Sequence, residues 1–112
     1  MRLRDEVDVL RAGEHEDDFG NGIMPDWYNG VTTVASAVPA EVVFTTVATY
    51  NDDGRNALIE ELRAVVEPMD FDPVWNRLRW RGEVYMTDGP PMIRRRNGTD
   101  HHLTIPLKQV NG

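Results

Sequence analysis

The histidines and the acidic residues beside them are the side chains best suited to bind a metal. His15 lies in the acidic run "EHEDD" at 14–18, and His101 and His102 follow Asp100. Imidazole and carboxylate groups are typical ligands of zinc. Adjacent residues of a strand point to opposite faces, so at most one of His101 and His102 is expected to join a shared site. The spacing favours histidines at a strand entry and a solvated acidic loop, and we expect no metal and no cofactor.

Other arrangements that support catalysis are equally weak. Asp52 and Asp53 could act as an acid–base pair, but they precede Gly54, and aspartates there commonly hydrogen-bond the backbone of a turn. The run "DDFGNG" leads into "IMPDW" and not into a helix, so it predicts no phosphate-binding loop. Ser36 is the only serine and has no base nearby in sequence, and the chain has no cysteine. We expect that this protein is not an enzyme.

Length and composition predict one compact domain. A chain of 112 residues with 40% hydrophobic content can bury one core but not two, so we expect a single domain over 1–112. No run approaches the roughly 18 apolar residues that span a bilayer, and the opening "MRLRDEVDVL" lacks the apolar region of a signal peptide. With the absence of cysteine, these features predict a soluble, unprocessed protein made in the cytoplasm, without a membrane partner.

Charge is distributed unevenly along the chain. The net charge of -7 argues against a general nucleic-acid-binding protein, because affinity for phosphate comes from clustered Lys and Arg. Yet six of the eleven arginines lie between Arg77 and Arg96, whereas the first 26 residues carry eight acids and three arginines. We therefore expect surfaces of opposite charge, a feature that orients partners.

Most of the chain has the two-residue periodicity of β-strands. Alternation or Val/Thr-rich composition marks the runs "EVDVLR", "VTTVASAV", "EVVFTTVATY" and "HLTIPLKQV". Turn-rich segments separate them. Pro106 interrupts the last run, so that strand is expected to lie at an edge or a bulge there. The apolar positions expected in the core are Val7, Val9, Leu78, Trp80, Val84, Met86, Leu103, Ile105 and Leu107.

Residues 74–91, "VWNRLRWRGEVYMTDGPP", form a predicted hairpin. A loop of two residues would place Val84 and Met86 on the outer face, beside arginines. A loop of three residues after Trp80 instead pairs Trp80 with Val84 and Leu78 with Met86, so that one face is apolar. We therefore predict the longer loop. The residues expected to point outward are Arg77, Arg79, Tyr85 and Thr87.

Residues 56–66, "NALIEELRAVV", fit either a helix or a strand. Their apolar residues recur at helical spacing, whereas a strand would place Glu60 between Leu58 and Leu62 on one face. The β-branched Ile59, Val65 and Val66 weaken the case for a helix. The pattern alone favours a short helix here, in a protein that is otherwise mostly β.

The order of several motifs carries a resemblance to a known family. The chain opens with "DEVDVLRAG", continues through "FGNGIMPDW", "VTTVASAVPAE", "DGRNALIEELRAVVEP" and "RLRWRGEVYMTDGPP", and ends with "GTDHHLTIPLKQVNG". In this order and spacing, over nearly the whole chain, it resembles the head-to-tail stopper (head-closure) proteins of long-tailed phages, especially those of actinobacterial hosts. The most specific pieces are the opening D-x-V-x-V-L-R, the hairpin W-R-G-E-V-Y-x-x-D-G-x-P and the closing segment 100–112, "DHHLTIPLKQVNG".

The resemblance implies a small β-barrel with long loops and at most one short helix, in which 58–66 is a strand. Members of that family form a ring of their own copies, expected here as a hexamer or a dodecamer, in the virion neck. Portal and adaptor proteins lie above the ring, and tail terminator or tail tube proteins lie below it. The ring closes the channel around packaged double-stranded DNA, with non-specific contact only. The implied location is the virion, at the head-to-tail interface.

The same resemblance aligns 39–55 with the channel-facing loop of the family. Here the segment is rich in β-forming residues and has no basic residue before Arg55, so a gating loop and a strand both stay open. A neutral to acidic lining suits a channel through which DNA must slide. The residues expected to line it are Thr45, Thr46, Thr49, Tyr50, Asn51, Asp52 and Asp53. The arginines expected to contact partners are Arg79 on the hairpin strand and Arg94, Arg95 and Arg96 in an exposed loop.

Two functions from other classes stay open. A small barrel could bind a ligand or a single nucleic-acid strand by stacking on aromatic side chains. A metal-dependent hydrolase could use His15, His101 and acidic residues. Ring formation without a ligand separates the neck protein from both, and bound metal identifies the hydrolase. The aromatic residues considered for stacking are Trp27, Tyr28, Trp75 and Tyr85.

Overall fold

The chain folds almost entirely into β-strands. The computed structural model describes residues 3–50 and 56–110, without the side chains of residues 45–50, 56–60 and 100. The described residues form nine strands and no helix. The strands are β1 (Asp5–Arg11), β2 (Gly13–Glu16), β3 (Ile23–Asp26), β4 (Thr32–Tyr50), β5 (Asn56–Val66), β6 (Asn76–Trp80), β7 (Glu83–Thr87), β8 (Met92–Arg96) and β9 (Thr99–Gln109).

Six of the strands close into an antiparallel barrel. Their order is β5-β4-β1-β6-β7-β9, and pairing of β5 with β9 closes the ring of strands. β8 adds to the edge of β9 outside this closed set, and β2 pairs only with β3 in a separate two-stranded ribbon. The prediction of a mostly β protein with a small barrel is therefore confirmed. In the part of the chain that the structure describes, no helix has the length and hydrophobicity needed to cross a bilayer.

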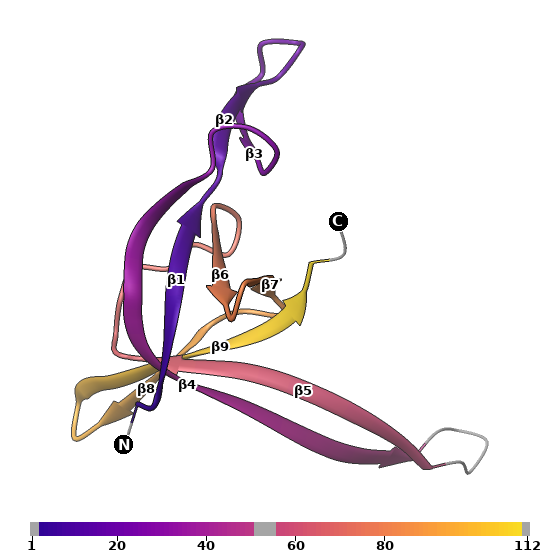
Figure 1. Ribbon diagram of the computed structural model, residues 1–112, viewed down its shortest axis with the longest axis vertical. Coiled ribbons are helices and arrows are strands. Elements are labelled where there is room, and N and C mark those ends of the chain that lie inside the picture. Colours follow the sequence, from indigo (N-terminus) through magenta and orange to yellow (C-terminus); the bar gives the residue numbers. More distant parts are fainter. Residues whose placement is uncertain (1–2, 51–55, 111–112) are drawn as a thin grey trace.

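Three hairpins project from the barrel (Figure 1). The β2–β3 ribbon extends from one end, the outer part of the β4–β5 hairpin extends sideways, and the β8–β9 hairpin lies at the end opposite β2–β3. The barrel thus acts as a central body that holds three separate projections.

The barrel interior contains the apolar positions of the alternating strands. Of the nine predicted core residues, Val7, Val9, Leu78, Leu103, Ile105 and Leu107 are buried. Trp80 is only partly buried, although it packs against this cluster. Ala40 and Ala64, both fully buried, leave room for the larger side chains of the facing strands. Period-two alternation therefore identified most of the core.

The predicted register of the β6–β7 hairpin is wrong. Leu78 pairs with Tyr85 and Trp80 pairs with Glu83, so the loop has two residues. Arg81 and Gly82 both have positive φ, 51° and 78°, as the two central residues of a type I′ turn require. Tyr85 consequently packs against the core, whereas Val84 and Met86 lie on the outer face with Arg77. The pattern of apolar residues did not decide the register, because both faces of this hairpin carry apolar side chains.

Of the two alternatives for 56–66, the strand is correct and the helix that the local pattern favoured is not. The segment is strand β5, which pairs with β4 along its whole length and with β9 at its inner end. Ala64 and Val66 alternate into the core, and Leu62 packs beside them. The small side chain of Ala64 belongs to the buried face, although a count of large apolar residues overlooks it.

The segment from 39 to 50 is a strand, which decides between the two alternatives for the part that is described. It forms the outer half of β4, whose pairing with β5 continues to Tyr50 opposite Asn56. Residues 51–55, which include Asn51, Asp52 and Asp53 of the predicted channel lining, lie outside the described residues.

Arg94, Arg95 and Arg96 lie on a strand and not in the predicted loop. They belong to β8, whose five residues are all exposed. Asn97 and Gly98, with φ of 54° and 77°, form the two-residue turn into β9. Asn-Gly is the strongest short signal for such a hairpin, so the sequence contained the information that places these arginines on a strand.

Pro106 occupies a position where its missing N–H is tolerated. It lies on β9 between the residues that pair with β8 and those that pair with β7. Its carbonyl oxygen accepts the N–H of Asp88 at 2.8 Å, from the segment that connects β7 to β8. The proline therefore faces a gap between two neighbouring strands, which fulfils the same physical requirement as the predicted edge or bulge.

Candidate functional site

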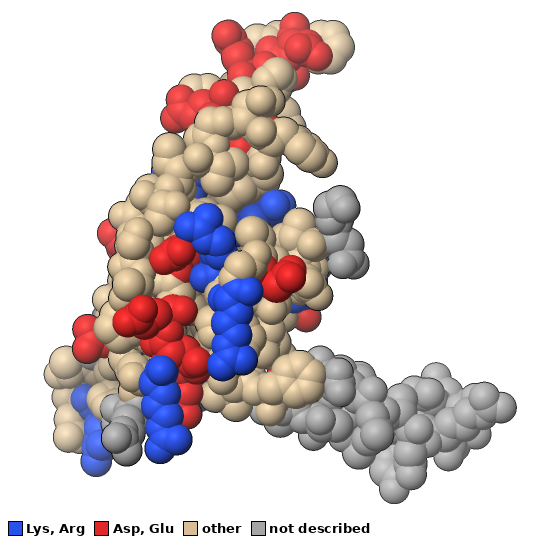
Figure 2. Space-filling model, in the orientation of Figure 1, with Lys and Arg blue, Asp and Glu red and all other residues tan. Residues whose placement is uncertain are grey.

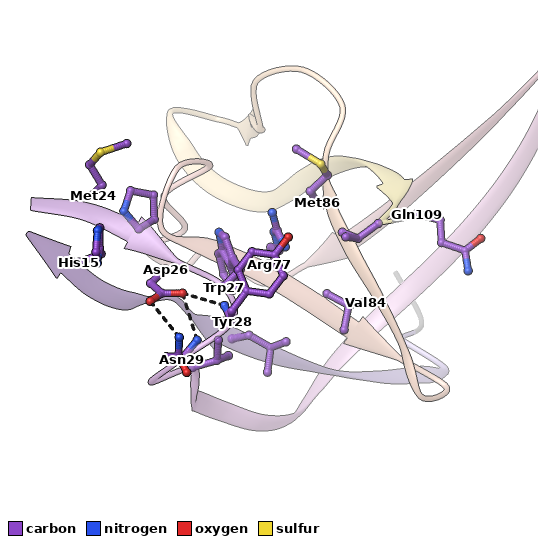
Figure 3. Close-up of a pocket in the computed structure, with 14 residues that line it drawn as sticks. His15, Met24, Asp26, Trp27, Tyr28, Asn29, Arg77, Val84, Met86 and Gln109 are labelled. Carbon is purple, nitrogen blue, oxygen red and sulfur yellow. Dashed lines mark hydrogen bonds between the residues drawn. The ribbon is translucent and has the colours of Figure 1, made fainter. Parts of the chain in front are cut away.

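The loop after β3 is organised by the carboxylate of Asp26. Its Oδ1 atom accepts the N–H of Tyr28 at 2.8 Å and the N–H of Asn29 at 3.0 Å. These bonds, that of Tyr28 first, lower the pKa of Asp26 below its ordinary value. An aspartate that binds the backbone two residues ahead is a common turn element. The turn holds Trp27 and Tyr28 over the barrel, as Figure 3 shows.

Gly13 allows this loop to lie against the start of the β2–β3 ribbon. A Cβ atom at this position would overlap the backbone carbonyl of Asn29. Any other residue would therefore push the loop away. The close approach joins the ribbon and the loop into one unit beside the barrel.

A groove of about 850 Å³ lies between this unit and the outer face of β6 and β7 (Figure 3). Val84 and Met86, which were predicted to be internal, form part of one wall. The two-residue hairpin turn therefore places two apolar side chains in the groove. The residues that line the groove are Leu10, His15, Met24, Pro25, Asp26, Trp27, Tyr28, Asn29, Val31, Arg77, Val84, Met86, Gln109 and Val110.

The aromatic side chains in the groove are not equivalent. The guanidinium carbon of Arg77 lies 4.2 Å from the centroid of the Trp27 ring, a cation–π contact that covers one face of the indole. Burial lowers the pKa of Arg77, although an arginine stays charged at any physiological pH. Tyr28 is 95% exposed and is the aromatic residue that the groove presents to solvent.

The four aromatic residues considered for stacking do not form one platform. Trp27 and Tyr28 meet in the groove, whereas Tyr85 packs against the barrel core beside Trp80, with ring centroids 6.3 Å apart. Trp75 lies beneath Arg11, whose guanidinium carbon is 4.8 Å from the ring centroid.

The carboxylate of Asp26 accepts hydrogen bonds from the backbone of its own turn, at Tyr28 and Asn29. The groove therefore offers an apolar contact surface, without an arrangement that would make Asp26 an acid or base.

The histidines do not converge on one site. His15 lines the groove, while His101 and His102 border a separate depression of about 160 Å³. The prediction that His101 and His102 point apart is wrong, because their Nδ1 atoms lie 2.7 Å apart. β9 has a bulge here: Arg94 pairs with His102 and Arg95 with Asp100, which leaves His101 as an extra residue. Among the described residues, no three His, Cys, Asp or Glu side chains form a group that could hold a metal.

The arginines predicted to contact partners fall into two environments. Arg79 on β6 binds Asp8 on β1, directly opposite, through Nε at 3.1 Å and Nη2 at 2.8 Å. Its guanidinium is thus held within the chain. Arg94, Arg95 and Arg96 lie exposed on β8. The role of all four at a partner surface stays a prediction.

The described part of the predicted channel lining lies away from the groove. The backbone of Thr45, Thr46, Thr49 and Tyr50 follows the outer half of β4, on the projecting hairpin (Figure 1). The groove itself was not predicted. The feature of the sequence that could have indicated the groove is the pair Val84 and Met86, which alternate with the buried positions of the hairpin in the correct register. Apolar residues on an outer face indicate a second contact surface.

Comparison of this chain with protein-family models, with curated proteins and with solved structures gives no match.

Proposed function

We propose that this chain is a structural protein of the neck of a long-tailed phage. Copies of it form a ring between the portal and adaptor proteins and the tail, close the DNA channel after packaging and provide the tail attachment surface. The role is structural and not enzymatic, and the protein is located in the virion. The order of motifs along the chain and the small barrel support this proposal.

The observation that carries the proposal is the outer part of the β4–β5 hairpin, which we call the arm. Residues 45–50 pair with 56–61, and this register continues inward to Phe44 opposite Leu62. The inner partner β9 pairs with β5 only from Leu62 onward. At about 3.3 Å per residue, the six outer pairs extend about 20 Å beyond the closed barrel.

A two-stranded arm of this length needs a further surface to stabilise it. An isolated two-stranded hairpin is at best marginally stable in water, because only one row of hydrogen bonds holds it. The arm therefore fits a protein that functions in an assembly, where neighbouring copies or partners pack against it. In a ring with a central channel, such an arm can extend toward the channel and contact the DNA there.

The composition of the arm suits contact with moving DNA. Residues 45–61 contain one basic residue, Arg55, and four acids, Asp52, Asp53, Glu60 and Glu61. Tight binding of phosphate requires clustered basic side chains, so a lining with so few of them lets the duplex slide. In the proposed ring the arms point to the channel, and the lining consists of Thr45, Thr46, Thr49, Tyr50, Asn51, Asp52 and Asp53.

The proposal is tested by shortening the arm without changing its register. Deletion of 46–49 together with 57–60 removes four complete pairs, and the even number keeps every remaining side chain on its own face. We expect a folded barrel with a nearly unchanged melting temperature, rings in electron micrographs, and filled heads that release DNA to nuclease. Complete retention of DNA by heads carrying the shortened protein would contradict the proposed role of the arm.

A second test addresses the location of the protein. Mass spectrometry of purified virions should detect the chain in fixed proportion to the portal protein, and electron microscopy should place it at the head-to-tail junction. Tailed particles that lack the chain would overturn the proposal as a whole.

The groove favours one alternative function, that of a binding module. Its exposed Tyr28 could stack on a nucleobase or a small aromatic ligand. Against this, the face of Trp27 under Arg77 is already covered. Quenching of tryptophan fluorescence by oligothymidylate tests the alternative, and saturable quenching that is lost in Tyr28→Ala would favour it over the neck protein.

A further inference from the structure

One face of the β2–β3 ribbon carries carboxylates and an exposed apolar side chain. Glu16 pairs with Ile23 and Glu14 with Pro25, and directly opposed residues point to the same face. Glu14, Glu16 and Ile23 border a depression of about 450 Å³. Ile23 is 59% exposed. We call this surface, formed by Glu14, Glu16 and Ile23, the ribbon face.

The ribbon face carries charge that its own chain compensates weakly. Glu14 lies 3.9 Å from Arg11, and both side chains are well exposed, so this ion pair contributes little. Glu16 makes no ion pair with another described residue. Residues 13–26 contain five acids and no Lys or Arg. Figure 2 shows acidic side chains gathered at the tip of this projection.

A face of opposite charge lies on β8. This strand pairs only with β9 among the described strands, and all five of its residues are exposed. Alternate residues of a strand share a face, so Met92, Arg94 and Arg96 lie together. Met92 is 45% exposed. We call this surface, formed by Met92, Arg94 and Arg96, the arginine face.

The two faces match in spacing as well as in charge. Glu14 and Glu16 are two residues apart on β2, as Arg94 and Arg96 are on β8. Each step of two residues along a strand covers about 6.4 to 6.8 Å, so both pairs of charges can meet at once. With Arg94 at Glu16 and Arg96 at Glu14, Met92 lies two residues past Glu16, toward the end of the ribbon where Ile23 begins β3. The match therefore covers two ion pairs and places Met92 at the apolar end of the ribbon face.

A single copy cannot bring these faces together, because they lie at opposite ends of the molecule (Figure 1). We propose that the ribbon face of one copy binds the arginine face of the next copy. Such a contact joins different surfaces of two identical chains, and it closes a ring when the rotation between copies is suitable. The inference rests on the proposed ring and names the surfaces that hold it together.

Charge reversal on each side separately, followed by mixing, tests this contact. One variant carries Arg94→Glu and Arg96→Glu, and the other carries Glu14→Arg and Glu16→Arg. Sedimentation velocity across protein concentrations measures assembly. Each variant alone should need about 100-fold more protein than the wild type to assemble, because like charges then face each other. An equimolar mixture should assemble at wild-type concentrations, because both kinds of contact are again complementary.

Matched controls separate this contact from a general effect of charge. Arg4→Glu with Lys108→Glu changes the net charge as much as the first variant, and Glu6→Arg with Glu67→Arg matches the second; all four side chains are exposed. Both controls should assemble like the wild type. Raising the salt concentration should weaken wild-type assembly, since exposed ion pairs are screened.

The outcomes distinguish this contact from the ring itself. If the wild type assembles and either reversal variant assembles equally well, the contact is wrong and the ring stands. Failure of the mixture to assemble, with both variants folded by circular dichroism, also overturns the contact. A wild type that stays monomeric at every concentration overturns both the contact and the proposed self-assembly.

Discussion

Asp8 and Arg79 face each other across strands β1 and β6, and both Nε and Nη2 of the arginine donate to Oδ2 of the aspartate. The other oxygen of Asp8, Oδ1, accepts the N–H of Ala37 at 3.0 Å. Ala37 belongs to a bulge of β4, where Ser36 and Ala37 together lie opposite Asp8. One carboxylate thus connects three neighbouring strands of the barrel.

The first prediction concerns the pH dependence of this connection. The N–H of Ala37, and then Arg79, lower the pKa of Asp8 below its ordinary value of 3.8. Because the folded pKa is the lower one, the stabilisation is present above pH 3.8 and is lost as the pH falls toward the folded value. Asp8→Asn should therefore lower the urea midpoint at pH 7, and the difference from the wild type should shrink in acid. A constant difference from pH 7 to pH 2 would contradict this origin.

The second prediction concerns the backbone of Ala37. Its φ of 52° lies in the left-handed region, which costs a residue with a Cβ about 1 to 2 kcal/mol. Ala37→Gly should therefore raise the free energy of unfolding by about 0.5 to 1 kcal/mol, after the greater freedom of glycine in the unfolded chain is subtracted. Chemical denaturation measures the change. Ala35→Gly on the same strand is the matched control and should lower stability.

The third prediction tests the register of the β6–β7 hairpin. Leu78 is fully buried in the barrel, so Leu78→Ala should cost about 2 to 5 kcal/mol. Val84 lines the groove on the outer face, so Val84→Ala should cost about 1 kcal/mol or less. Denaturant unfolding of both variants gives the comparison. A loss at Val84 as large as that at Leu78 would show that Val84 faces the core.

The fourth prediction concerns the histidine pair on β9. Burial, and then the neighbouring His101 and Arg94, lower the pKa of His102 below its ordinary value of 6.5. As the pH falls, His102 is protonated in the unfolded chain before it is protonated in the folded chain. The contribution of neutral His102 to stability is therefore fully present above pH 6.5 and is lost as the pH drops toward the lower folded pKa. The thermal midpoint should decrease from pH 8 to pH 5, and His102→Gln should reduce that decrease. His15→Gln, which is remote from the pair, should leave the decrease unchanged.

Local pattern determined which residues lie in strands and which side of most strands is buried. The apolar residues of β1 and β9 alternate with other side chains, so one face of each strand is apolar and is buried away from water. These residues are Val7, Val9, Leu103, Ile105 and Leu107. Asparagine at 97 and glycine at 98 were sufficient to define a turn. These features depend on a few adjacent residues, so they can be derived from the chain alone.

Tertiary structure decided the features that depend on pairing between distant residues. Both faces of the β6–β7 hairpin carry apolar side chains, so the choice of which face enters the barrel came from the tight turn at Arg81 and Gly82 and from the groove that receives Val84 and Met86. The bulge at His101 follows from a register shift in the pairing of β8 with β9, between Arg94 and Arg95. The meeting of Asp8 with Arg79, 71 residues apart, required the pairing of β1 with β6. Alternation has a period of two and contains no information about which strand is the neighbour, so only the folded barrel could bring these residues together.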